Sequence, residues 1–253
     1  MKKITVVIAS LILMLIISGC GTKVTKEEVV SGAVKKSLNS FETDMKTEFK
    51  ISSNGQDISS TTDIALVYKD DPFITHMKMS MIEGEIELYI DKESAYMKMP
   101  GEEGWIQAPT GSIPEFEEMA SGDSIKKDLE KINEFSELFS FEQKDGGYVL
   151  DVKLDENSSD KEKELVTSVL TEELQNQSIK VSKVNKFNYS YTIDKDYNLK
   201  NVLTEADLEI VMDGQTTQIS IKADADYKNI NSVKDFSIPA EVTDNVIEMD
   251  LES

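Results

Sequence analysis

Cys20 is the only cysteine in the 253-residue chain, and the residues before it suit acylation of its thiol. The sequence Ile17-Ser18-Gly19-Cys20 places an aliphatic residue and two small residues directly before the cysteine. Small residues let the extended chain enter a signal peptidase site, and the thiol can form a thioether with diacylglycerol. The spacing therefore predicts that Cys20 is acylated in a bacterial lipobox.

The residues upstream of this motif are typical of a secretory signal peptide. Lys2 and Lys3 give a positive start, and the apolar stretch Ile4 to Ile17 is shorter than the about 20 residues that a transmembrane helix needs. We expect a signal peptide over 1–19, an acylated cysteine and short tether over 20–25, and a single domain over 26–253. The acyl chains would hold the protein on the extracytoplasmic face of the cell membrane.

Methionines recur at alternate positions of predicted strands, which places them on one face of a sheet. The residues that we assign to a candidate ligand cavity are Met45, Met77, Met79, Met81, Met97, Met99 and Trp105. Methionine is flexible and polarizable, so a methionine face can accept varied apolar partners. The same pattern also fits ordinary packing of a sheet, and the lone tryptophan fits packing as well as a cavity mouth.

Two arrangements of potential metal ligands do not converge. Thioethers suit Cu(I), but His76 lies on the opposite face of its strand from Met77. The segment from Asp194 to Glu205 mimics the spacing of an EF-hand loop, but Leu199 stands where that loop needs glycine. We predict no metal site and no cofactor, and an ordinary hairpin turn at Asp194.

Composition excludes several classes of function. The 48 acidic residues against 27 basic ones give a net charge of −21, which argues against binding to nucleic acid. The sequence has no Gly-rich phosphate loop and no GxSxG motif, and nothing fixes a catalytic pair of carboxylates. We therefore predict that the protein is not an enzyme.

The elements that position these residues follow from periodicity. Apolar residues at helical spacing predict a helix over Lys26–Leu38, another over 124–139, and a third after the capping box Ser159-x-x-Glu162. Pro114 predicts the first turn of a further short helix, which Gly122 ends. Strict alternation and turn residues predict antiparallel strands. The expected strands are 41–51, 59–68, 73–82, 85–90, 94–99, 148–154, 187–193, 206–212 and 216–227. The fold class is therefore α+β.

The order of lipobox, helix, meander, helices and second meander resembles the LolA/LppX-like fold of lipoprotein-localisation factors and mycobacterial lipid-carrier lipoproteins. Within it, the chain is most similar to a family of uncharacterised lipoproteins from Gram-positive bacteria. The resemblance rests on Ser40-Phe41, Asp71-Pro72, Tyr96 to Trp105, Tyr148 to Leu154 and Ile238-Pro239-x-x-Val242. It implies a curved, incomplete β-barrel of about 9–11 strands, closed by amphipathic helices around an apolar cavity.

These observations favour a membrane-anchored lipoprotein that binds a lipid, an acyl chain or a hydrophobic peptide without catalysis. The alternative is an envelope lipoprotein with a packed core and no ligand, whose acidic surface or edge strands meet another envelope protein.

Overall fold

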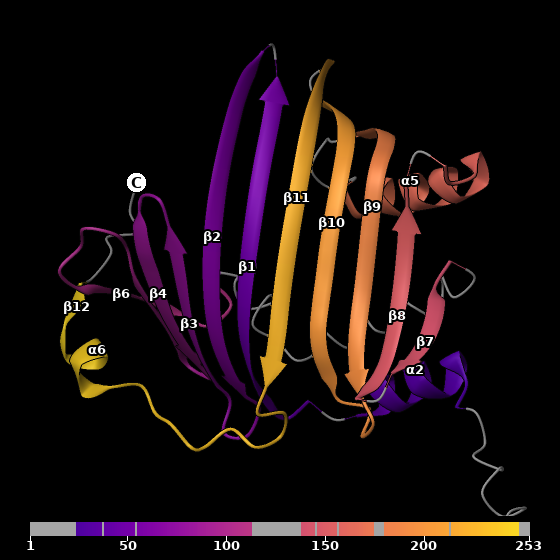
Figure 1. The fold of residues 1–253 in the computed structure, drawn as a ribbon. Helices are drawn as coiled ribbons and strands as arrows, with labels where there is room; N and C mark the ends of the chain where they lie inside the picture. The colour runs from indigo at the N-terminus through magenta and orange to yellow at the C-terminus, as the bar shows by residue number, and fades with distance from the viewer. Residues whose placement is uncertain are drawn as a thin grey trace, which may run out of the picture.

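The computed structural model describes residues 24–247, apart from 37, 54, 113–137, 145, 156, 175–179 and 213. The described residues form one sheet of 12 strands and three helices (Figure 1). The helices are α2 (Lys26–Lys35), α5 (Asp160–Leu174) and α6 (Ala240–Asp244). The strands are β1 (Ser40–Ser53), β2 (Gln56–Lys69), β3 (Ile74–Met81), β4 (Gly84–Asp91), β5 (Ser94–Lys98), β6 (Trp105–Pro109), β7 (Ser140–Lys144), β8 (Gly147–Leu154), β9 (Lys180–Asp194), β10 (Leu199–Met212), β11 (Gln215–Lys228) and β12 (Val246–Ile247).

The two β regions of the sequence join in the middle of the sheet. The strand order is β12-β6-β5-β4-β3-β2-β1-β11-β10-β9-β8-β7, so β1 pairs with β11 at the centre. All neighbours are antiparallel except β12 and β6. The long central strands bend along their length, and the sheet is curved and open (Figure 1). This confirms the predicted open, curved antiparallel sheet.

The nine strands predicted from alternation are all present, and β6, β7 and β12 bring the number to twelve rather than nine to eleven. Helix α2 ends at Lys35, earlier than the predicted Leu38. The capping box of α5 is confirmed, because Ser159 N donates to Glu162 Oε2 at 2.9 Å and Glu162 N donates to Ser159 Oγ at 3.3 Å. The signal peptide, Cys20, Pro114 and the helix predicted from Ser124 lie outside the described residues.

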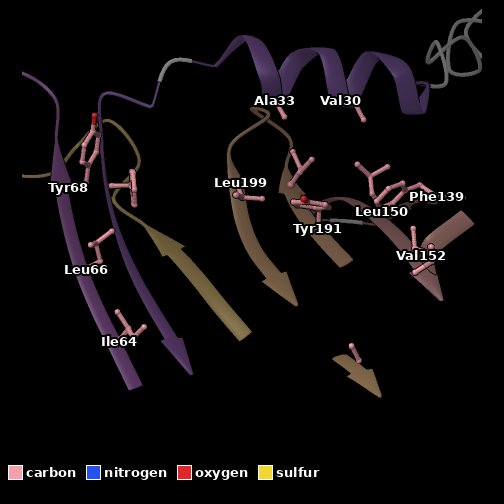
Figure 2. Close-up of a cluster of buried hydrophobic side chains, with 14 of the residues drawn as sticks. Val30, Ala33, Ile64, Leu66, Tyr68, Phe139, Leu150, Val152, Tyr191 and Leu199 are labelled. Atoms are coloured by element: carbon pink, nitrogen blue, oxygen red, sulfur yellow. The ribbon is translucent and has the colours of Figure 1, made fainter. Parts of the chain in front are cut away.

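The main hydrophobic core lies on one face of the sheet, which we call the inner face. Helices α2 and α5 both contribute to it, α2 through Val29, Val30 and Ala33 and α5 through Val166. Figure 2 shows Val30 and Ala33 directed toward side chains of the sheet. On the opposite, outer face, a smaller cluster joins Tyr89, Tyr96 and Trp105 to Val242 of α6. No helix in the described ranges is long and apolar enough to cross a membrane.

Candidate ligand-binding face

One row of apolar residues crosses nine strands of the inner face in register. The row starts at Ile86 on β4 and ends at Phe141 on β7, and its members pair from strand to strand. In order, they are Ile86, Met79, Ile64, Met45, Ala225, Val202, Tyr191, Leu150 and Phe141. Because strand side chains alternate, this register turns every second residue of these strands toward one shared surface, apart from the register shifts between β9 and β10.

The structure brings four of the six predicted methionines together in two neighbouring rows. Met45 and Met79 flank Ile64 in the nine-strand row. Met77 and Met97 flank Leu88 in the next row. Met77 is only 1% exposed, whereas Met45, Met79 and Met97 are half-buried against the core.

The other two methionines, Met81 and Met99, are half-buried near the ends of β3 and β5. Met81 is the last residue of β3, and Met99 directly follows the last residue of β5.

Burial on the inner face falls toward the hairpin between β1 and β2. Near α2, Leu150 is fully buried and Tyr191 is 1% exposed. Further along the strands, Phe49 and Ile51 of β1 are half-buried. In the row of Ile51, Ile58 on β2 is 67% exposed. The same row is buried on β10 and β9, where Leu208 is 5% and Val184 4% exposed. At this end of the long strands the inner face is therefore open over β1 and β2 and packed over β9 and β10.

Helix α2 is fixed over the packed end by local contacts. Thr25 caps it, accepting from Glu28 N through Oγ1 at 3.2 Å while its own backbone N–H donates to Glu28 Oε2 at 2.9 Å. Lys26 Nζ donates to the carbonyl oxygen of Phe139 at 3.1 Å. A Cβ at Gly32 would lie 2.7 Å from the ring of Tyr197, so only glycine lets the helix approach this closely.

Two hydroxyl groups on the inner face have no hydrogen-bond partner. Thr75 is fully buried and Thr43 is 7% exposed, and neither Oγ1 atom is paired. Both lie among apolar residues, since Thr43 pairs with Leu66 and Thr75 pairs with Tyr68 and Ile90. Burial of an unpaired hydroxyl costs about 1–3 kcal/mol, so these groups offer polar atoms that the fold itself does not use.

Trp105 does not belong to this face, which corrects its predicted place beside the methionines. Its ring centroid lies 5.6 Å from that of Tyr89 in the outer cluster, and its side chain is 6% exposed. The reason is strand register. Ile106, rather than Trp105, pairs with Met97 and so shares the face of the methionines.

His76 has the opposite orientation from the methionines, as predicted, but it is not simply an exposed strand residue. Its Nε2 lies 2.8 Å from Glu87 Oε1, and its ring stacks on Tyr89 with centroids 4.1 Å apart. Burial raises the pKa of Glu87, but hydrogen bonds from His76 and Lys78 outweigh it and the pKa lies below its ordinary value. Burial, with the negative charge of Glu87 nearby, raises the pKa of Tyr89 to about 12.

A cavity of about 580 Å³ lies on the outer face above His76. Residues 229–237, which connect β11 to the segment before α6, form one side of it, and β1 to β4 form the other. Val67, Val233 and Phe236 supply apolar walls. Lys69 binds Asp235 of this connection, which lowers the pKa of Asp235. Sequence reasoning missed this assembly, because the register that joins His76 to Tyr89 is set by the β3–β4 pairing.

The segment that mimics a calcium loop is a hairpin turn, in agreement with the prediction. Asp194 Oδ1 accepts from the backbone N–H groups of Asp196 and Asn198, both at 2.9 Å. Glu205 is engaged on β10 instead, where its carboxylate lies 2.8 Å from Lys186 Nζ. Among the residues that the structure describes, no cluster of three or more His, Cys, Asp or Glu residues is arranged to hold a metal ion.

The rest of the outer face is solvated and charged. Lys186 and Lys222 both bind Glu205, and hydrogen bonding to Lys186 lowers the pKa of Glu205. Lys228 Nζ lies 2.5 Å from Asp44 Oδ2, and this bond raises the pKa of Lys228. Exposed pairs of this kind contribute little to stability because water screens them, so they set the polarity of the face more than its stability.

Fold and site together define a mostly β protein with few helices, built on one open, curved sheet with an apolar inner face and a charged outer face. The chain belongs to DUF6612, a family of unknown function whose sequence pattern matches residues 25–247. None of the curated proteins matches the chain.

Among solved structures, the chain is similar to a LolA superfamily protein from Nitrosomonas europaea, with 9% identity, a TM-score of 0.27, and coverage of 85% of this chain and 96% of that one. It is also similar to a DUF1329 family protein from Desulfovibrio piger, with 9% identity, a TM-score of 0.26, and coverage of 83% and 94%. TM-scores this low do not establish a common fold.

Proposed function

We propose that this chain is an extracytoplasmic lipoprotein, acylated at Cys20, that binds an apolar or amphipathic ligand on its inner face without catalysing a reaction. One observation carries the proposal: the apolar rows of the inner face extend beyond the packed core and remain accessible at Phe49, Ile51 and Ile58. A core needs no such extension, because exposed apolar area is unfavourable in water by about 25 cal/mol per Å².

The chemistry of this face suits a lipid, an acyl chain or a hydrophobic peptide. Half-buried methionines at Met45, Met79 and Met97 can change rotamer to fit a chain of variable shape. The face offers no charged group inside these rows, which favours a neutral or amphipathic ligand whose polar end stays in water.

Binding is tested with two adjacent substitutions on opposite faces of β1. Phe49 faces inward and is half-buried, whereas Lys50 is exposed on the outer face. We expect Phe49→Asn to weaken the binding of the apolar dye N-phenyl-1-naphthylamine about tenfold, the loss of about 1.5 kcal/mol of apolar contact. Lys50→Asn should leave dye binding unchanged. Equal effects of the two substitutions, or no dye binding at all, would support the packed-core alternative.

Native mass spectrometry and lipid extraction of the full chain test whether the protein carries a natural ligand. A lipid that copurifies reproducibly with the wild type and is depleted in Phe49→Asn supports carriage. A protein that is always free of ligand contradicts it.

Anchoring is tested separately by cell fractionation. Cys20→Ala removes the thiol and should release the protein from the membrane fraction. Ser18→Ala keeps a small residue at the cleavage site and should leave the protein bound. Retention of Cys20→Ala in membranes would refute acyl anchoring while leaving the ligand proposal intact.

A further inference from the structure

Strand β2 lies in the middle of the strand order, yet half of its length is paired on one side only. Strand β2 pairs with β1 along its whole length, from Gln56 to Lys69. On its other side, the pairing with β3 stops at Asp63, because β3 ends at Met81. No strand in the described part of the chain pairs with that side of residues 56–62, and Figure 1 shows β2 extending well past β3 and β4. We call residues 56–62 the free stretch.

The free stretch is exposed to solvent and lacks proline, lysine and bulges, which commonly protect strand edges. Residues 56–61 are all exposed, and residue 62 is half-buried. At about 3.4 Å per residue the stretch spans about 24 Å, enough for a strand of average length. Natural sheets protect edges with proline, lysine or bulges. The free stretch contains neither proline nor lysine, and its pairing with β1 continues without a register shift.

We propose that the free stretch is a docking site for an extended, basic segment of a partner protein, which adds to the sheet as a strand beside β2. Backbone groups on the open side of β2 would pair with those of the partner, as in β-strand addition. The partner strand would lie above the turn between β3 and β4, continuing the line of β3.

Side chains on the two faces of the free stretch specify the partner. Ile58 on the inner face is 67% exposed and calls for an aliphatic residue opposite it. On the outer face Asp57 lies within the stretch and binds Lys50 of β1, Glu48 binds Lys46, and Asp63 directly follows the stretch. The three carboxylates exceed the two lysines by one, and the added negative charge is that of Asp63.

The partner segment should therefore alternate aliphatic with Lys or Arg residues. A second copy of this chain is a poorer occupant, because each copy carries a net charge of −21.

The test uses the full chain in detergent and two fluorescently labelled peptides, KVKVKVK and EVEVEVE. We expect the lysine peptide to bind in fluorescence anisotropy, more weakly as salt is raised, and the glutamate peptide not to bind. Hydrogen exchange should show new protection of residues 56–62 when the lysine peptide is present.

Ile58→Lys should weaken binding of the lysine peptide at least tenfold, because it places a charge on the inner side of the docking site. Ile247→Lys is the matched control: it makes the same change at an isoleucine that is 45% exposed on β12, at the end of the sheet order and away from the free stretch. It should leave binding unchanged.

Three results would overturn the proposal: equal binding of both peptides, equal effects of the two isoleucine substitutions, or protection outside residues 56–62. A dimer in sedimentation that Ile58→Lys dissociates and Ile247→Lys does not would also overturn it, by assigning the stretch to a second copy. None of these four results bears on the inner-face proposal. That proposal is tested by dye binding to Phe49→Asn and Lys50→Asn, which are separate variants.

Discussion

Single residues in this protein are held by contacts that admit little change. Gly147 at the start of β8 has a φ of 154°, and a Cβ there would lie 2.1 Å from the carbonyl oxygen of Ile193. That atom is backbone of the adjacent strand and cannot move aside without disturbing the pairing. Glycine is therefore required at this position by both conformation and space.

Gly147→Ala should destabilise the protein by about 2–3 kcal/mol, through a strained φ and a steric clash. Gly146→Ala is the control, because a Cβ at Gly146 meets no atom within 4 Å. Its effect should stay within about 0.5 kcal/mol. Urea unfolding followed by circular dichroism measures both. Similar midpoints for the two variants would show that β8 and β9 are not packed as described.

Glu87 should link stability to pH. Its pKa in the folded state lies below the ordinary value of 4.5, so ionised Glu87 stabilises the fold at neutral pH. That stabilisation is complete above pH 4.5 and is lost as the pH falls through the folded pKa.

We expect the difference in unfolding free energy between the wild type and Glu87→Gln to be constant above pH 4.5 and to shrink below it. His76→Ala should narrow the pH range of that loss, since it removes one of the hydrogen bonds that lower the pKa. A difference that does not change with pH would contradict the described His76–Glu87 contact.

At the scale of elements, alternation and capping motifs predicted most of the strands and helices, but they did not predict the short strands. Strand β1 was predictable because its inner and outer residues alternate without a break from Phe41 to Ile51. Strands β6 and β7 have only five residues each, and β12 has two, so alternation has too few repeats to show. These strands exist because neighbouring strands offer them edges.

The candidate site was predictable only within each strand. Alternation placed Met77 and Met79 on one face and His76 on the other. Which strands become neighbours, and in what register, depends on contacts far apart in sequence. Trp105 was therefore misplaced, and the contact between His76 and Glu87 was not foreseen.

Helix α2 should depend on its cap. Thr25→Ala removes the side-chain acceptor of the capping box and should lower stability by about 1 kcal/mol. Thr25→Ser keeps the hydroxyl and should cost little. Thermal unfolding of both variants tests this. If both variants unfold at the same temperature as the wild type, the packing of Val29, Val30 and Ala33 holds the helix without a contribution from the cap.

At the scale of the whole molecule, a bound ligand and the folded state should stabilise each other. A ligand that binds only the folded protein adds about 2.7 kcal/mol of stability at a hundred times its dissociation constant. We therefore expect solvent extraction of lipid from the full chain to lower its unfolding temperature, and readdition of the extract to restore it. The Phe49→Asn variant should show a smaller shift. An unchanged unfolding temperature after extraction would favour a core without ligand.

The central pairing of β1 with β11 also determines when the protein can fold. Glu42 and Lys228 are register partners although more than 180 positions separate them. Contacts at such separation are slow to form, because a long loop must close first. Strand β1 therefore cannot complete its pairing until β11 has been synthesised. Until β11 has emerged, the chain has no complete centre. A product truncated before β11 would therefore be left as two unjoined half-sheets.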